Sequence, residues 1–151
     1  MKNINMIKSK YLKFFPYDGL SIKEIETIEN VLKVELPVDF KKIASFFSGG
    51  ISVGGIDFFD FKRDDNNLNI IDETLRLRKE TLLNEDMIFL AELSESCVIF
   101  NVKAEPAIVW CDSIEVSIDN FLNNSFQNSP NTWDKFCDFF LEMLNSEIED
   151  F

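Results

Sequence analysis

Three apolar, β-rich runs follow one another closely in this chain: MIFLAEL at 87–93, SCVIFNV at 96–102 and AIVWCD at 107–112. Only SE and KAEP, two and four residues, separate them. A parallel neighbour would need a crossover of about a dozen residues or more, so connections of hairpin length indicate antiparallel pairing. The runs therefore predict three consecutive antiparallel strands, which restricts the kind of sheet that the chain can build.

Residues 21–50 predict two helices before this sheet. Ser21 and Glu24 have the spacing of a capping box, and isoleucines at helical spacing then predict a helix over about 21–32. Pro37 suits the first position of a second helix, and Asp39 is favourably placed in its first turn. Gly49–Gly50 can supply the left-handed residue that ends this helix. Its apolar stripe consists of Phe40, Ile43, Ala44 and Phe47.

The remaining segments complete an alternation of helices and strands. Gly54–Gly55 is a hairpin signal between short strands near 51–53 and 56–61. IEVSIDNFL at 114–122 is a further candidate strand. An amphipathic helix is expected over about 132–146, capped by Asn131 or Thr132. A third helix is expected over about 67–82, with one side formed by Leu68, Ile71, Leu75 and Leu82.

This order of elements predicts an α+β fold. The expected architecture is a mostly antiparallel central sheet of about five to six strands with about four flanking helices. A length of 151 residues suits one domain, residues 1–151, and 46% hydrophobic residues provide its core. No run of eighteen apolar residues occurs, so no membrane-spanning helix is expected.

The negative charge is confined to one half of the sequence. Residues 1–82 carry 13 basic and 13 acidic side chains, whereas residues 83–151 carry only Lys103 and Lys135 against 14 acidic ones. The net charge of −12 therefore lies in the second half. Such a surface repels nucleic acid and anionic membranes and attracts a basic partner. A role in solubility alone is the other interpretation.

The residue types argue against catalysis and metal binding. The chain contains no histidine and no nucleotide-binding or nucleophile motif, so no catalytic residue, cofactor or metal is predicted. The cysteines at 97, 111 and 137 have apolar neighbours and predict buried free thiols in a reducing cytosol. A carboxylate enzyme or a calcium site remains an alternative for the acids between 57 and 65, although the segment lacks the pattern of a calcium loop. These acids are Asp57, Asp60, Asp64 and Asp65.

Several motifs in order resemble the SUKH superfamily of Smi/Knr-like proteins. LPVDFKKIASFFSGG at 36–50 is similar to its LP-x-D-[FY] helix with a glycine pair, and GGIDFFDF follows it. PAIVWCD is similar to a family strand that ends in Trp-x-Asp, and TWDKFCDFFLEML is similar to the closing aromatic helix. The likeness covers about 20–145. The chain departs from the family at LAELSESCVIF, which lacks the glycine-rich turn of many members.

The resemblance implies function by binding rather than catalysis. Bacterial members are mostly immunity proteins of polymorphic toxin systems, so a cytoplasmic protein that neutralises a cognate toxin, favoured as a basic nuclease, is expected. Contacts with nucleic acid or membranes are not expected, and the chain itself should be a monomer or a weak homodimer. A regulatory or signalling interaction module with the same fold is the alternative. The acidic residues expected to bind the partner are Glu92, Glu95, Glu105, Asp112, Glu115 and Asp119.

Overall fold

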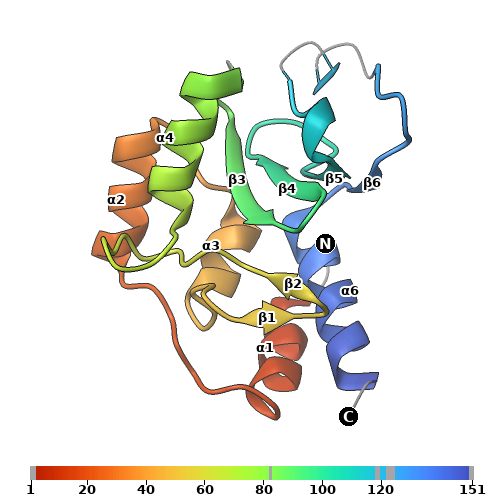
Figure 1. Cartoon of the computed structure of the whole chain (residues 1–151). Helices are drawn as coiled ribbons and strands as arrows, with labels where there is room; N and C mark the ends of the chain where they lie inside the picture. The colour runs from red at the N-terminus through yellow and green to blue at the C-terminus, as the bar shows by residue number, and fades with distance from the viewer. Residues whose placement is uncertain (1–2, 82, 118–119, 122–124, 150–151) are drawn as a thin grey trace.

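The computed structural model describes residues 3–81, 83–117, 120–121 and 125–149, which form an α+β fold (Figure 1). A four-stranded antiparallel sheet has the order β3-β4-β5-β6, with strands Met87–Glu92, Ser96–Asn101, Ile108–Asp112 and Asn131–Trp133. A short 3₁₀ helix, η1 (Ser113–Glu115), follows β5 directly. The predicted fold class and the three consecutive antiparallel strands are confirmed.

A small hairpin extends the sheet beyond β3. It pairs β1 (Ser52–Val53) with β2 (Ile56–Asp57), and an isolated antiparallel bridge then joins Phe58 to Ala91 of β3. Both turn glycines have positive φ, as the hairpin signal predicts. Gly54 also has no room for a side chain, because a Cβ there would lie 2.5 Å from the backbone oxygen of Met143.

The described residues contain five α-helices in two groups (Figure 1). α2 (Ile22–Leu32) packs against α4 (Ile70–Thr81), and α4 packs against β3. α1 (Ile4–Leu12), α3 (Val38–Ala44) and α6 (Phe136–Glu149) contact one another on the other side of the molecule. The capping box that begins α2 is present as predicted, with both of its hydrogen bonds between Ser21 and Glu24.

Aromatic rings fill the space between the four-stranded sheet and the group formed by α1, α3 and α6. The Phe40 ring of α3 lies 5.3 Å from Phe100 of β4 and 4.9 Å from Phe136 of α6, measured between ring centroids. Tyr11 of α1 contacts Phe47 and other rings nearby, and burial raises its pKa to about 12. Because these rings come from all parts of the chain, their burial couples the helices to the sheet.

Two polar side chains tie separate elements together. Asp39, only 7% exposed, accepts hydrogen bonds from the backbone N–H of its neighbour Phe40 (2.9 Å) and from that of Cys137 in the first turn of α6 (3.0 Å). Arg78 of α4 donates to three backbone oxygens, those of Leu32, Glu85 and Met87. Asp39 therefore joins α3 to α6, and Arg78 joins α4 to the end of α2 and the start of β3.

The helix expected over about 67–82 is α4 in the structure, and it differs from the prediction in its first residue and in its buried face. It begins at Ile70, because Asn69 caps it by accepting from the N–H of Asp72 (2.9 Å). Leu68 is 64% exposed and Leu75 is also exposed, whereas Ile71 is buried as predicted and residue 82 lies outside the described residues. The buried side of α4 instead consists of Ile70, Ile71, Thr74 and Leu77.

Three other predictions of local structure are wrong. The helix expected after Pro37 is α3, and it ends at Ala44, so Gly49–Gly50 does not terminate it. Gly49 is needed for another reason: a Cβ at this position would lie 2.3 Å from the backbone oxygen of Phe59. Residues 113–115 form η1 rather than a strand, and Ile118 lies outside the described residues. Asn131 and Thr132 do not cap the last helix, because they belong to β6 and pair with β5.

Candidate partner-binding surface

Three of the acidic residues expected to bind a partner lie at one end of the four-stranded sheet. Glu92 ends β3, Glu95 belongs to the connection to β4, and Asp112 ends β5. The strand register pairs Glu92 with Cys97 and Ser96 with Asp112, and the N–H of Ser113 donates to the backbone oxygen of Glu95 (3.0 Å). We call Glu92, Glu95 and Asp112 the acidic end.

The charges of the acidic end are only partly compensated. Glu92 and Glu95 are exposed, and Asp112 is half-buried. Arg76 of α4 lies 3.9 Å from Glu92, but it makes closer ion pairs with Glu73 (2.9 Å) and Glu80 (3.0 Å). Asp112 accepts a hydrogen bond from the neutral amide of Asn128 (2.8 Å), which leaves its negative charge uncompensated.

Glu115, which follows the acidic end in the sequence, is a buried residue with a structural role. Its side chain is 7% exposed, and its carboxylate accepts from the backbone N–H groups of Gln127 and Asn128. The backbone oxygen of Glu115 accepts from the side chain of Asn120 (2.7 Å). Glu115 therefore anchors the segment that precedes β6 and does not belong to the exposed acidic surface. Asp119, the neighbouring candidate, lies outside the described residues.

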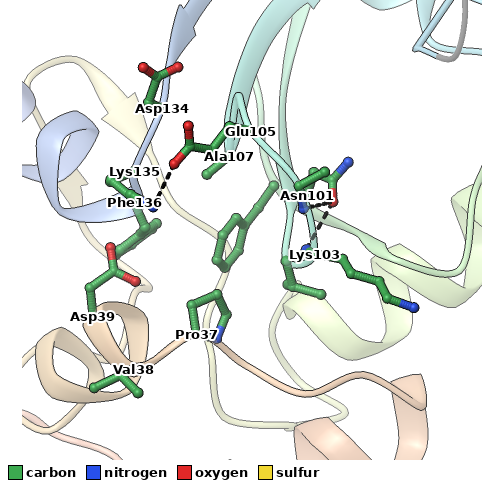
Figure 2. Close-up of a pocket in the computed structure, with 13 residues that line it drawn as sticks. Pro37, Val38, Asp39, Asn101, Lys103, Glu105, Ala107, Asp134, Lys135 and Phe136 are labelled. Carbon is green, nitrogen blue, oxygen red and sulfur yellow. Dashed lines mark hydrogen bonds and ion pairs between the residues drawn. The ribbon is translucent and has the colours of Figure 1, made fainter.

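Glu105 lies at the opposite end of the sheet, in the connection between β4 and β5. Its carboxylate forms an ion pair with Lys135, 2.5 Å away, and the hydrogen bond from this pair raises the pKa of the lysine (Figure 2). Lys103, the other base of residues 83–151, lies in the same connection. The six predicted contact residues therefore do not form one continuous patch, because the chain folds Glu105 away from the acidic end.

A hollow of about 380 Å³ lies beside Glu105 (Figure 2). Pro37 and Val38, at the start of α3, form one wall, and the segment of Asp134 to Phe136 forms another. Figure 2 shows Asp39 directed toward this second wall, where its carboxylate receives the hydrogen bond from Cys137. This hollow combines apolar surface with a compensated ion pair, which suits contact with a mixed or neutral surface better than with a strongly basic one.

The other residues considered for chemistry have structural environments. The three cysteines are buried. Burial raises the pKa of Cys97, and it raises the pKa of Cys111 to about 12, so both thiols favour the unreactive protonated form. Asp60 and Asp64 accept backbone hydrogen bonds within their own loop, from Lys62 and Asn66. Within the described residues, no group of His, Cys, Asp or Glu could hold a metal ion.

Sequence reasoning missed the exposure of Ile114, a large apolar side chain that stands two residues after Asp112 of the acidic end. It placed Ile114 in a strand, where alternation with Val116 directs both toward a core. In the structure Val116 is buried but Ile114 is 92% exposed, the highest value among the exposed large hydrophobic residues described. Its position between two acids was visible in the sequence, but its exposure follows from η1, which nothing in the apolar pattern indicates.

Residues 19–145 match the model of the SMI1 / KNR4 family (SUKH-1). The match begins after α1 and covers all the other described helices and strands, ending within α6. No curated protein matches the chain. No described helix has the length and apolar character needed to cross a membrane.

Proposed function

Because the chain belongs to the SMI1 / KNR4 family (SUKH-1), we propose that it is an immunity protein that binds a cognate toxin domain and keeps it inactive. SUKH proteins are generally known as immunity proteins. The favoured partner is a toxin domain with a basic surface, such as a nuclease that binds the phosphates of its substrate. Covering that surface with carboxylates would exclude the substrate without any chemistry by the immunity protein.

The observation that carries this proposal is the solvent-accessible and only partly compensated charge of the acidic end. Both bases of residues 83–151 lie at the opposite end of the sheet, and Arg76 of α4, which lies 3.9 Å from Glu92, pairs more closely with Glu73 and Glu80. Exposed charges of one sign steer a partner of opposite sign and raise the association rate. Glu105 and the hollow beside it form a separate candidate contact, which the proposal does not require.

Co-expression with the toxin domain encoded beside the chain tests the proposal. We expect growth to be restored and the two proteins to purify as a stoichiometric complex. Growth arrest despite soluble expression of both proteins, together with no complex, would contradict it. Capture of a cellular protein in place of the toxin domain would favour the alternative, a regulatory interaction module.

The electrostatic part is tested by neutralising the acidic end through Glu92→Gln, Glu95→Gln and Asp112→Asn. We expect the association rate at low ionic strength to fall about tenfold, because steering by opposite charge changes on-rates by this order or more. The difference from the wild-type chain should shrink as salt rises, since the Debye length falls to about 3 Å at 1 M salt.

A control variant carries the same change in net charge at another place. Glu26 of α2, Asp57 of β2 and Asp65 are exposed, and no ion pair involves their side chains among the described residues. Changing all three to their amides should reduce the association rate much less than neutralising the acidic end does. Equal reductions would show that only the total charge matters and would remove the acidic end from the proposal.

A further inference from the structure

Ile114 presents an apolar side chain to solvent at the position where the acidic end meets η1. It is 92% exposed and stands two residues after Asp112, while Ser113 between them is hydrogen-bonded to the backbone of Glu95. Solitary exposed apolar side chains are common on protein surfaces and need no explanation by themselves. The interest of Ile114 therefore depends on how the turn is held and on what surrounds it.

The turn that carries Ile114 is fixed on both sides. Ser113 N–H donates to the Glu95 backbone oxygen (3.0 Å), which continues the pairing of β4 with β5. On the other side, Glu115 is buried and accepts from two backbone N–H groups, and Val116 is buried in the core. Since both neighbours of the isoleucine are held, its exposure is a property of the folded turn. A side chain presented in this way loses less conformational freedom on binding.

The end of β5, which leads into the turn of Ile114, carries both charge and a partly exposed aromatic side chain. Trp110 of β5 is half-buried, and its indole N–H donates to the hydroxyl of Ser96 (2.8 Å). Trp110, Asp112 and Asn128 line a small hollow of about 150 Å³. Protein interfaces are commonly organised as an apolar or aromatic centre inside a rim of polar and charged groups. Ile114 provides an exposed apolar side chain at this end of the sheet, and Asp112 and Glu95 provide charged groups for such a rim.

We infer that Ile114 is the apolar anchor of the toxin-binding surface and that it enters an apolar pocket bordered by lysine or arginine on the toxin domain. The inference rests on the proposed function and specifies its geometry. Acids such as Glu95 accelerate the encounter, because charges at the rim act mainly on the association rate. Burial of Ile114 slows dissociation, because affinity differences within one interface arise mostly in the dissociation rate.

The test compares Ile114→Ser with Ile22→Ser against the toxin domain encoded beside the chain. Ile22 is 78% exposed and begins α2, a helix that lies well away from β5 in Figure 1. We expect Ile114→Ser to weaken binding about 30-fold, the loss typical of a hot-spot residue, through faster dissociation at an unchanged association rate. Ile22→Ser should stay within about twofold of wild type. Ile114→Leu should retain most of the affinity, because it keeps the apolar volume.

The outcomes separate the inference from the function on which it rests. If the wild-type chain binds and Ile114→Ser dissociates at the wild-type rate, the anchor is wrong and the immunity function stands. If both serine variants weaken binding equally, Ile114 has no special position, and the inference fails in the same way. If the wild-type chain does not bind the toxin domain at all, the proposed function fails and the inference falls with it. Unchanged thermal unfolding of the serine variants verifies that they are folded.

Discussion

Replacing Asp39 by alanine should lower the free energy of unfolding by about 2–4 kcal/mol. The carboxylate is 7% exposed and accepts from the N–H of Cys137 at 3.0 Å, in the first turn of α6. A hydrogen bond to a charged group contributes about 1.5–3 kcal/mol, and an anion at a helix N-terminus adds about 0.5–1 kcal/mol. The bond to Phe40 lies within the same turn, so we assign it little additional energy.

Equilibrium unfolding in urea, followed by circular dichroism, measures this loss. Domains of this kind are stable by only about 5–15 kcal/mol, so the expected change would shift the midpoint clearly. Asp39→Asn keeps an oxygen acceptor but removes the charge, and it should cost about 1 kcal/mol. Asp57→Ala, an exposed control on β2, should remain within about 0.5 kcal/mol of wild type.

The reasoning would be refuted by an Asp39→Ala variant as stable as the control. That result would mean that α6 is positioned by its aromatic face alone and that the contact between Asp39 and α6 adds nothing. A loss of equal size in Asp39→Ala and Asp39→Asn would point instead to the charge as the whole source of the stabilisation.

Three further predictions concern stability. Gly54→Ala should lower the free energy of unfolding, measured in urea, by about 2–4 kcal/mol, because the new Cβ would meet the backbone of α6. In the control Gly55→Ala the Cβ points into open space, so only the positive φ costs energy, about 1 kcal/mol. Equal losses in the two variants would exclude the clash. Arg78→Met should lower the free energy of unfolding by about 2–3 kcal/mol, because it removes three hydrogen bonds to backbone oxygens. The control Lys79→Met, at an exposed position, should leave the stability unchanged, and similar losses in both variants would show that the bonds of Arg78 add nothing. The pKa of Asp72 is lowered from 3.8, chiefly by the hydrogen bond from Asn69, which caps α4. The ionised carboxylate therefore stabilises the folded protein above about pH 3.8, and this stabilisation is lost as the pH falls through the folded-state pKa. Wild type should therefore lose stability below pH 3.8 more steeply than Asp72→Asn, and parallel unfolding curves against pH would contradict this.

The parts of the fold with strong local signals could be predicted from the sequence. The capping box predicted α2 to within one residue, since both of its partners lie in the same short segment. Connections of two and four residues predicted the pairing of β3, β4 and β5 because such lengths permit little else. The hairpin at Gly54–Gly55 was equally local, as both residues require positive φ.

The wrong predictions occurred where distant contacts override local patterns. Thr74 is fully buried on α4 because its hydroxyl accepts from the N–H of Phe89 on β3 (2.9 Å), and no helical periodicity indicates a polar residue on the buried side. Asn131 and Thr132 suit helix caps, but pairing with β5 places them in a strand. α1 was not predicted, because only contacts with α3 and α6 give its mixed sequence a buried side.

The sequence could predict that the candidate surface is negatively charged, but it could not predict which acidic residues lie together on it. The sequence showed that the acids concentrate after residue 82, yet it could not show that the sheet separates Glu105 from the acidic end or that Glu115 is buried. Those outcomes depend on which end of a strand each acid follows and on the backbone groups that face Glu115. The exposure of Ile114 likewise depends on η1 and required the structure.

The central claim is that this chain acts by occupying a basic surface of another protein. The most direct measurement is a titration of the toxin domain's activity with the purified chain. The account predicts that activity declines linearly and disappears at one equivalent, and that neutralising the acidic end slows this inhibition at low salt. Full toxin activity in the presence of excess folded chain would contradict it.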